Sequence, residues 1–121
     1  MKLRFGWGPK DGAEGMRKNI ELIKTVRSVV GEDVDLMADV YMGWTFEYAK
    51  RMMRLIDNEN LRWLEEPVIA DDIDGYADLK AGCQTPISGG EHEYTLFGFR
   101  QLLEKKAVDV VQFDTNRVGG I

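Results

Sequence analysis

Cysteine, proline and long apolar runs are scarce in this sequence. Cys83 is the only cysteine and there are three prolines in 121 residues, so an internal disulfide is excluded and the thiol is interpreted as a small packing residue. No apolar run approaches the roughly 18 residues that span a bilayer, and the N-terminus lacks the apolar core of a signal peptide. We therefore expect a cytoplasmic protein with no membrane partner.

Basic residues are also in the minority. Lysine and arginine number 16 against 21 aspartates and glutamates, which gives a net charge of −5 and a pI near 4.9. General affinity for nucleic acid needs clustered basic side chains that displace counterions from phosphates, so no nucleic-acid partner is expected. The length and the 44% hydrophobic content fit one globular domain.

Short apolar runs, each ended by glycine, proline or an acid, alternate with helical patterns. The runs predict strands, and the first helix keeps one apolar face from Gly12 to Val30, where Gly31 ends it. Thr45 is the expected N-cap of the second helix. The predicted strands are 2–5, 34–39, 61–65, 86–88 and 108–113, and the later helices are expected to end near 57, to follow 71–72, and to begin near 95.

This alternation predicts an α/β fold. Strands joined by helical crossovers run parallel, so their carboxyl ends lie on one side and face one shared site. The pattern itself leaves a doubly wound sheet and a barrel open. The chain has neither a Gly-x-Gly-x-x-Gly sequence after a strand nor a phosphate-binding Gly-Lys-Ser/Thr loop, which disfavours the nucleotide-binding doubly wound fold.

Three carboxylates stand at equal intervals, and each closes one of the apolar runs. They are Asp39, Glu65 and Glu91, and one βα unit between neighbours would bring all three to the same rim. Oxygen ligands without histidine or cysteine suit Mg²⁺ better than zinc. We expect these three side chains to hold a divalent cation, with Asp114, at the end of the next run, beside the metal as a supporting or proton-relay acid.

Further candidates lie beside these acids. Lys2 and Arg4 are two positions apart on the first strand and therefore point to one face. One of them could act as a base, since a lysine near a bound cation and out of bulk water has a lowered pKa. His92 could contact substrate or make a supporting hydrogen bond. Strand alternation allows only one of Glu65 and Glu66 to face inward and does not say which.

Four segments, in order, resemble one known family. The segments 39–44 (DVYMGW), 63–67 (WLEEP), 89–92 (GGEH) and 114–121 (DTNRVGGI) are similar to the barrel domain of the enolase superfamily, in its mandelate racemase and muconate lactonizing enzyme branch. Within that branch the chain most resembles the acid-sugar dehydratases of the L-rhamnonate dehydratase group, over essentially its whole length. The resemblance implies a partial TIM-type (β/α) barrel, in which residues 1–121 form about strands 2 to 6.

The resemblance also assigns the metal ligands. It implies Asp39, Glu65 and Glu91 as ligands of Mg²⁺, which selects Glu65 over Glu66. The implied activity is dehydration of a small sugar acid: a base removes the α-proton through a metal-stabilised enediolate, and the β-hydroxyl then leaves to give a 2-keto-3-deoxy acid. A racemase or epimerase of the same superfamily and a non-catalytic, truncated metal-binding module are the alternatives.

Other implied roles depart from the usual family pattern. Lys2 keeps the first lysine of a Lys-x-Lys motif, whereas Arg4 replaces the second and is a poor base, so it is implied as a partner for a substrate carboxylate. Asp114 matches the aspartate that orients a catalytic histidine on the next strand, and that histidine would lie beyond Ile121. Tyr41 stands where many members have asparagine.

The family barrel has eight strands and a capping domain before it. Residues 1–121 are therefore expected to be an incomplete barrel domain, with Met1 an internal methionine of a longer enzyme. We expect this piece alone to have little or no dehydratase activity, because its first and last strands keep unpaired edges. The full-length form is expected to be a homo-oligomer.

Overall fold

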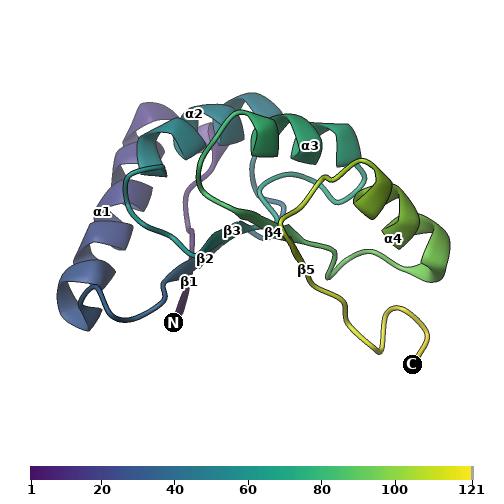
Figure 1. Ribbon diagram of the computed structural model, residues 1–121. Helices are drawn as coiled ribbons and strands as arrows, with labels where there is room; N and C mark the ends of the chain where they lie inside the picture. The colour runs from purple at the N-terminus through teal and green to yellow at the C-terminus, as the bar shows by residue number, and fades with distance from the viewer. Residues whose placement is uncertain (121) are drawn as a thin grey trace.

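The computed structural model describes residues 1–120 and has one row of parallel strands with the helices along one side of it (Figure 1). The last residue of the fourth family-like segment, Ile121, lies outside the described residues. Neighbouring strands in the sheet are also neighbours in sequence. They are β1 (Lys2–Arg4), β2 (Met37–Asp39), β3 (Trp63–Glu65), β4 (Ile87–Gly89) and β5 (Val110–Val111).

Each pair of successive strands is joined through a helix, as the sequence predicts. The helices are α1 (Gly12–Val30), α2 (Phe46–Ile56), α3 (Ile73–Ala81) and α4 (Thr95–Glu104). A short 3₁₀ helix, η1 (Pro9–Asp11), which the sequence patterns did not predict, precedes α1. The predicted α/β fold with parallel strands is confirmed. None of the helices in residues 1–120 has the length and apolar character needed to cross a membrane.

Helix ends follow the predicted positions but not always the predicted chemistry. Gly31, with φ of 79°, ends α1, and its N–H donates to the carbonyl of Arg27. Thr45 is the residue before α2, yet its side chain makes no capping hydrogen bond. Asp72 does cap α3, because its carboxylate accepts the N–H of Gly75 at 3.0 Å. For α2, the sequence therefore predicts correctly where the helix begins, but not a capping hydrogen bond from the Thr45 side chain.

The core lies between the sheet and the helices. Leu3, Ala38, Leu64 and Ile87 are register partners across four strands, and all are buried. Alternation along a strand puts this row on one face, where it packs against buried apolar side chains of the helices. These helix residues include Ile23, Met52, Met53, Ile56 and Leu79.

The next position along each strand forms a polar row on the opposite face. Arg4, Asp39, Glu65 and Ser88 are register partners at the carboxyl ends of β1 to β4. Because the strands are parallel, all four side chains leave the sheet on the same side and at the same level. The fold therefore concentrates charge at one rim of the sheet, away from the helices.

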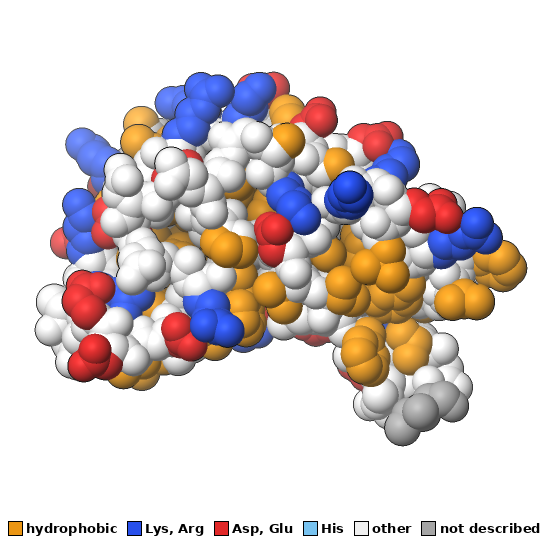
Figure 2. Space-filling model, viewed as in Figure 1, with side chains coloured by type: hydrophobic (Ala, Val, Ile, Leu, Met, Phe, Trp, Pro, Cys, Tyr) orange, Lys and Arg blue, Asp and Glu red, His pale blue; other side chains and the backbone are white. Residues whose placement is uncertain are grey.

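The C-terminal third of the chain exposes apolar side chains. Leu96 and Phe97 of α4 are 80% and 73% exposed, and Phe113 beyond β5 is 64% exposed. Figure 2 shows apolar side chains gathered where α4 meets the C-terminal segment. The strand at this end of the sheet, β5, pairs with β4.

Candidate functional site

Two carboxylates lie side by side at the rim. Asp39 and Glu65 are direct register partners on β2 and β3, and their side chains are only 10% and 1% exposed. Like charges directly opposite each other in a sheet are destabilising unless a cation lies between them. That cation is Lys2, whose Nζ is 2.8 Å from Glu65 Oε1 and 3.4 Å from Asp39 Oδ2.

Further polar groups fix these two carboxylates. Arg4 Nη2 is 3.5 Å from Asp39 Oδ2, so Lys2 and Arg4 do share one face, as their spacing predicts. The indole Nε1 of Trp63 donates to Glu65 Oε2 at 3.3 Å. Both oxygens of Glu65 are thus engaged, one by an ammonium group and the other by an indole N–H.

The expected lowering of the Lys2 pKa applies next to a bound cation, whereas the charges nearest to Lys2 here are two carboxylates. Partial burial does act to lower the pKa of Lys2, but the hydrogen bond and charge of Glu65, together with the charge of Asp39, outweigh it and raise the pKa above its ordinary value. The reason is that Lys2 faces two carboxylates. In this arrangement Lys2 is a counter-charge to Asp39 and Glu65.

Glu91 lies one strand further along, in the turn after β4. It is half-buried and follows Gly90, whose φ of 111° turns the chain sharply at the end of the strand. Among residues 1–120, no three His, Cys, Asp or Glu side chains are arranged to hold one metal ion. The structure therefore joins Asp39 and Glu65 through Lys2, whereas Glu91 stands apart from them.

Glu91 and Asp114 line the same depression. This open hollow of about 560 Å³ is also bordered by Gln112, whose Oε1 accepts the hydroxyl of Ser88 at 2.5 Å. Asp114 follows β5 by three residues; its Oδ1 accepts the backbone N–H of Asn116 at 2.8 Å, and its side chain is 36% exposed. The hollow thus brings two of the predicted acids to one place, next to the polar row.

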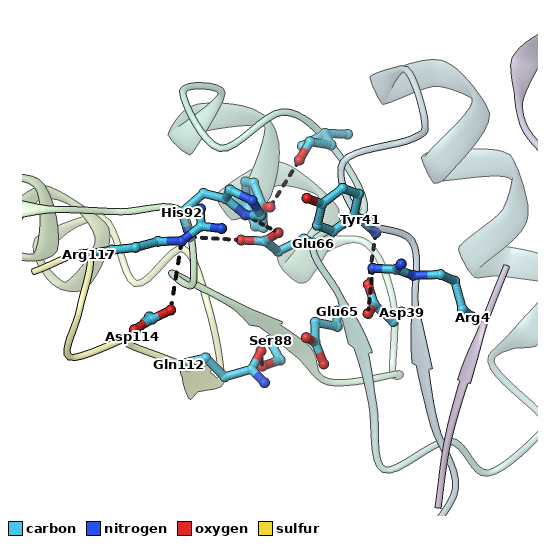
Figure 3. Close-up of polar contacts among 12 residues, drawn as sticks. Arg4, Asp39, Tyr41, Glu65, Glu66, Ser88, His92, Gln112, Asp114 and Arg117 are labelled. Carbon is cyan, nitrogen blue, oxygen red and sulfur yellow. Dashed lines mark hydrogen bonds and ion pairs between the residues drawn. The ribbon is translucent and has the colours of Figure 1, made fainter.

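Glu65 and Glu66 are both buried, although alternation along a continuing strand would place their side chains on opposite faces. The alternation ends because Glu66 lies one residue beyond β3 and has a left-handed backbone, with φ of 43°. Its Oε2 is 2.6 Å from His92 Nδ1, and its Oε1 accepts the backbone N–H of His92 at 3.3 Å (Figure 3). Burial raises the pKa of Glu66, and the contacts with His92 offset part of that rise.

This Glu66–His92 pair was missed from the sequence, although a signal existed. The two residues are 26 positions apart, the interval that also separates Asp39, Glu65 and Glu91. Each follows a predicted metal ligand by one residue. The same repeat that predicts a rim of acids therefore predicts a second contact just behind it.

The turn after β2 carries backbone strain at the site. Tyr41 and Met42 both have left-handed φ angles, 53° and 59°, which non-glycine residues adopt at a cost. The Tyr41 N–H donates to Asp39 Oδ1 at 2.9 Å. The Tyr41 ring centroid lies 4.5 Å from the guanidinium carbon of Arg4 and 5.3 Å from the ring centroid of His92. The strained turn therefore fixes Asp39 and links β1 to the turn after β4.

The lone cysteine takes no part in this rim. Burial raises the pKa of Cys83 to about 12, and its Sγ lies 3.4 Å from the carbonyl of Thr85. A thiol with so high a pKa is scarcely ionised near neutral pH. The interpretation of Cys83 as a packing residue agrees with this environment.

The donor set fits a hard divalent cation. Asp39 and Glu65 offer carboxylate oxygens to one positively charged group already, at 3.4 Å and 2.8 Å, and Glu91 adds a third carboxylate at the next strand end. Oxygen-only sites of this type suit Mg²⁺, which keeps coordination positions for water or substrate. Asp39 and Glu65 are placed to bind such an ion together. For Glu91 to join them, its side chain would have to turn toward them.

Comparison with known proteins places this rim in a family context. The profile of the Enolase C-terminal domain-like family matches residues 1–121. The chain is 41% identical to the L-rhamnonate dehydratase of Saccharopolyspora erythraea over 122 aligned positions, which cover 99% of this chain and 31% of that protein.

Solved structures give the same picture. Rhamnonate dehydratase from Gibberella zeae, complexed with Mg, matches with a TM-score of 0.94 and 36% identity, over 99% of this chain and 30% of that one. L-Talarate dehydratase from a Polaromonas species, complexed with Mg and L-glucarate, matches with a TM-score of 0.91 and 34% identity, over 100% of this chain and 32% of that one. The chain thus spans about a third of the length of these relatives.

Proposed function

Since the chain belongs to the Enolase C-terminal domain-like family, we propose that it is part of a Mg²⁺-dependent hydro-lyase that removes water from a small sugar acid. L-Rhamnonate is the first candidate substrate, because the relatives from Saccharopolyspora erythraea and Gibberella zeae are dehydratases of that acid. One observation carries the proposal: Asp39 and Glu65 are buried side by side at the carboxyl ends of β2 and β3 and share one cation.

Asp39, Glu65 and Glu91 are the proposed metal ligands. Their strand ends lie on neighbouring positions of one rim, and the first two already converge on a single positive charge. When bound there, Mg²⁺ supplies the charge that makes the hydrogen next to a substrate carboxylate acidic enough to remove. Glu91 completes the set by a side-chain movement within the open hollow that it lines.

The remaining polar residues of the rim are proposed to orient the substrate. Arg4 is 61% exposed on its side chain and carries a permanent charge, which suits an anionic substrate group. His92 directs Nδ1 toward Glu66, which leaves Nε2 to hydrogen-bond a substrate hydroxyl. Asp114 is proposed to orient the imidazole that moves the α-proton; that imidazole is not His92, whose Nδ1 faces Glu66.

A metal titration tests the proposed ligands directly. Isothermal titration of the purified chain with Mg²⁺ should give binding that Asp39→Asn abolishes, because the neutral amide removes one of the two buried charges. Asp35→Asn is the matched control: Asp35 precedes β2 at the other end of the strand and is exposed, next to Arg62. Equal heats for Asp39→Asn and the unaltered chain would remove the proposed site.

The reaction needs a test in a complete barrel. We expect the chain alone to turn over little or no L-rhamnonate, and steady formation of a 2-keto-3-deoxy acid by the purified chain would contradict that expectation. Replacing the matching third of the Gibberella zeae enzyme with this chain should give a protein that still dehydrates L-rhamnonate with Mg²⁺. Asp39→Asn in that chimera should abolish turnover while Asp35→Asn keeps it. A folded chimera that binds Mg²⁺ but dehydrates no sugar acid would contradict the proposed reaction.

A further inference from the structure

Lys2 occupies the position between two buried carboxylates that a bound cation would need. Its Nζ makes a 2.8 Å contact with Glu65 and a 3.4 Å contact with Asp39. In the described part of the chain, Lys2 Nζ has no hydrogen bond or ion pair other than these two. The ammonium group and a metal ion would therefore compete for the same oxygens.

The register of the sheet makes this competition unavoidable. Asp39 and Glu65 are fixed opposite each other by the pairing of β2 with β3, and the indole of Trp63 holds the second oxygen of Glu65. The Tyr41 N–H likewise holds Asp39 Oδ1 at 2.9 Å, so hydrogen bonds keep both carboxylates where they meet. Lys2, in contrast, has a side chain that is 42% exposed, so its long, flexible stem can swing away from the carboxylates.

We propose that Lys2 is an internal counter-cation that leaves Asp39 and Glu65 when a divalent cation binds, and that it thereby sets the metal affinity of the rim. The inference rests on the proposed metal site and adds a role that the proposed reaction does not require. Without metal, Lys2 neutralises part of the charge on two buried carboxylates and keeps β1 joined to β2 and β3. With metal bound, the ammonium is displaced, and the metal affinity is lowered by the ion pairs that have to be broken.

Removing the competitor should strengthen metal binding. Lys2→Met keeps the length of the stem and deletes the charge, so we expect Mg²⁺ to bind roughly fivefold more tightly, the factor that corresponds to one half-exposed ion pair. In EDTA the same variant should melt at a lower temperature than the unaltered chain, and saturating Mg²⁺ should narrow the difference. Lys2→Arg keeps a cation at the position and should leave both the Mg²⁺ affinity and the melting temperature in EDTA near those of the unaltered chain.

A second lysine variant tests whether tighter Mg²⁺ binding comes from removing the competing ammonium group or only from the change in net charge. Lys24→Met removes the same charge from α1, where Lys24 Nζ is 3.6 Å from Glu59 Oε1 and its side chain is 64% exposed. It should leave Mg²⁺ affinity unchanged. If Lys24→Met tightens binding as much as Lys2→Met does, the effect is one of net charge and the inference is wrong. If binding depends on Asp39 but Lys2→Met leaves it unchanged or weaker, the inference fails while the metal site stands.

A direct measurement covers the case in which Lys2→Met does not fold. In the unaltered chain with ¹⁵N- and ¹³C-labelled lysine, the Lys2 signals can be assigned by their loss in Lys2→Arg. Saturation with Mg²⁺ should move the Lys2 Nζ and Cε shifts to those of a free lysine, with little change at Lys24. Unmoved Lys2 signals at full metal occupancy would overturn the inference. Absence of any Mg²⁺ binding, in every variant, would overturn the metal site and the inference together.

Discussion

Deleting the imidazole of His92 is the sharpest test of the buried pair behind the rim. His92→Ala leaves the Glu66 carboxylate with only a backbone N–H, 3.3 Å from Oε1. The Glu66 side chain is 2% exposed and the imidazole 15%, so solvent cannot replace the lost partner. The expected result is a clear loss of stability from a change that removes no core methyl group.

The size of the loss follows from burial. Leaving a buried polar group without its hydrogen-bond partner costs about 1–3 kcal/mol, and more when the group is charged. Glu66 can avoid part of this cost by taking up a proton, since burial already raises its pKa. We therefore expect His92→Ala to lower the free energy of unfolding by about 2 kcal/mol, which is roughly 8 °C in Tm for a domain of this size. Glu66→Gln, which keeps an acceptor for the imidazole, should cost about 1 kcal/mol.

Urea unfolding followed by circular dichroism measures these values, and an exposed pair supplies the control. Arg100 Nε is 2.7 Å from Glu104 Oε1 on α4, but both side chains are more than 60% exposed. Arg100→Ala should therefore change the unfolding free energy by no more than about 0.5 kcal/mol. Losses of equal size for His92→Ala and Arg100→Ala would refute the argument that burial makes the Glu66–His92 pair important.

Three further predictions concern the core, the turn after β4 and the lone thiol. Leu64→Ala, at a fully buried position of β3, should cost about 2–5 kcal/mol in urea unfolding, whereas Leu55→Ala, at a half-exposed position, should cost less than about 1 kcal/mol. Gly90→Ala should lower Tm and shift the NMR signals of β5, because Gly90 has φ of +111° and a Cβ there would lie 2.5 Å from the Gln112 carbonyl oxygen; unchanged β5 signals would contradict this. Cys83, with its pKa raised from 9.0 to about 12 by burial, should be alkylated at about pH 8 roughly a thousandfold more slowly in the folded chain than in urea. Since the unfolded thiol ionises first, stability should fall as the pH rises from 9.0 toward 12, and mass spectrometry and alkaline unfolding curves would reveal a failure of either expectation.

The sequence predicted the elements of the fold well because their signals are local. Residues 12–30 form α1 as predicted, since one apolar face and a terminal glycine are contained in the segment itself. Four of the five strands are shorter than predicted, most clearly 108–113, of which only Val110–Val111 is a strand, and the predicted 86–88 is shifted by one residue to Ile87–Gly89. Strand β5 has one neighbour, so it forms fewer ladder hydrogen bonds than the apolar run alone would suggest.

The contacts at the rim were harder to predict because they depend on tertiary structure. Equal spacing predicted that Asp39, Glu65 and Glu91 meet; the first two are register partners that share Lys2, whereas among residues 1–120 no three such side chains are arranged around one point. The same interval separates Glu66 from His92, but the contact was missed because alternation assumes that the strand continues, and the left-handed backbone of Glu66 ends it. Equal spacing could not predict that Lys2 lies between the carboxylates, since the reach of a long side chain is set by the packing around it.

The indole hydrogen bond to Glu65 has a spectroscopic consequence. Trp63 donates to the same carboxylate that Lys2 contacts, so any change of charge at that carboxylate alters the electric field across the indole ring. The other two indoles, Trp7 and Trp44, belong to a separate group in which Trp44 Nε1 donates to the Trp7 carbonyl. Fluorescence emission from position 63, isolated by Trp7→Phe and Trp44→Phe, is thus a built-in optical reporter of occupancy at the rim.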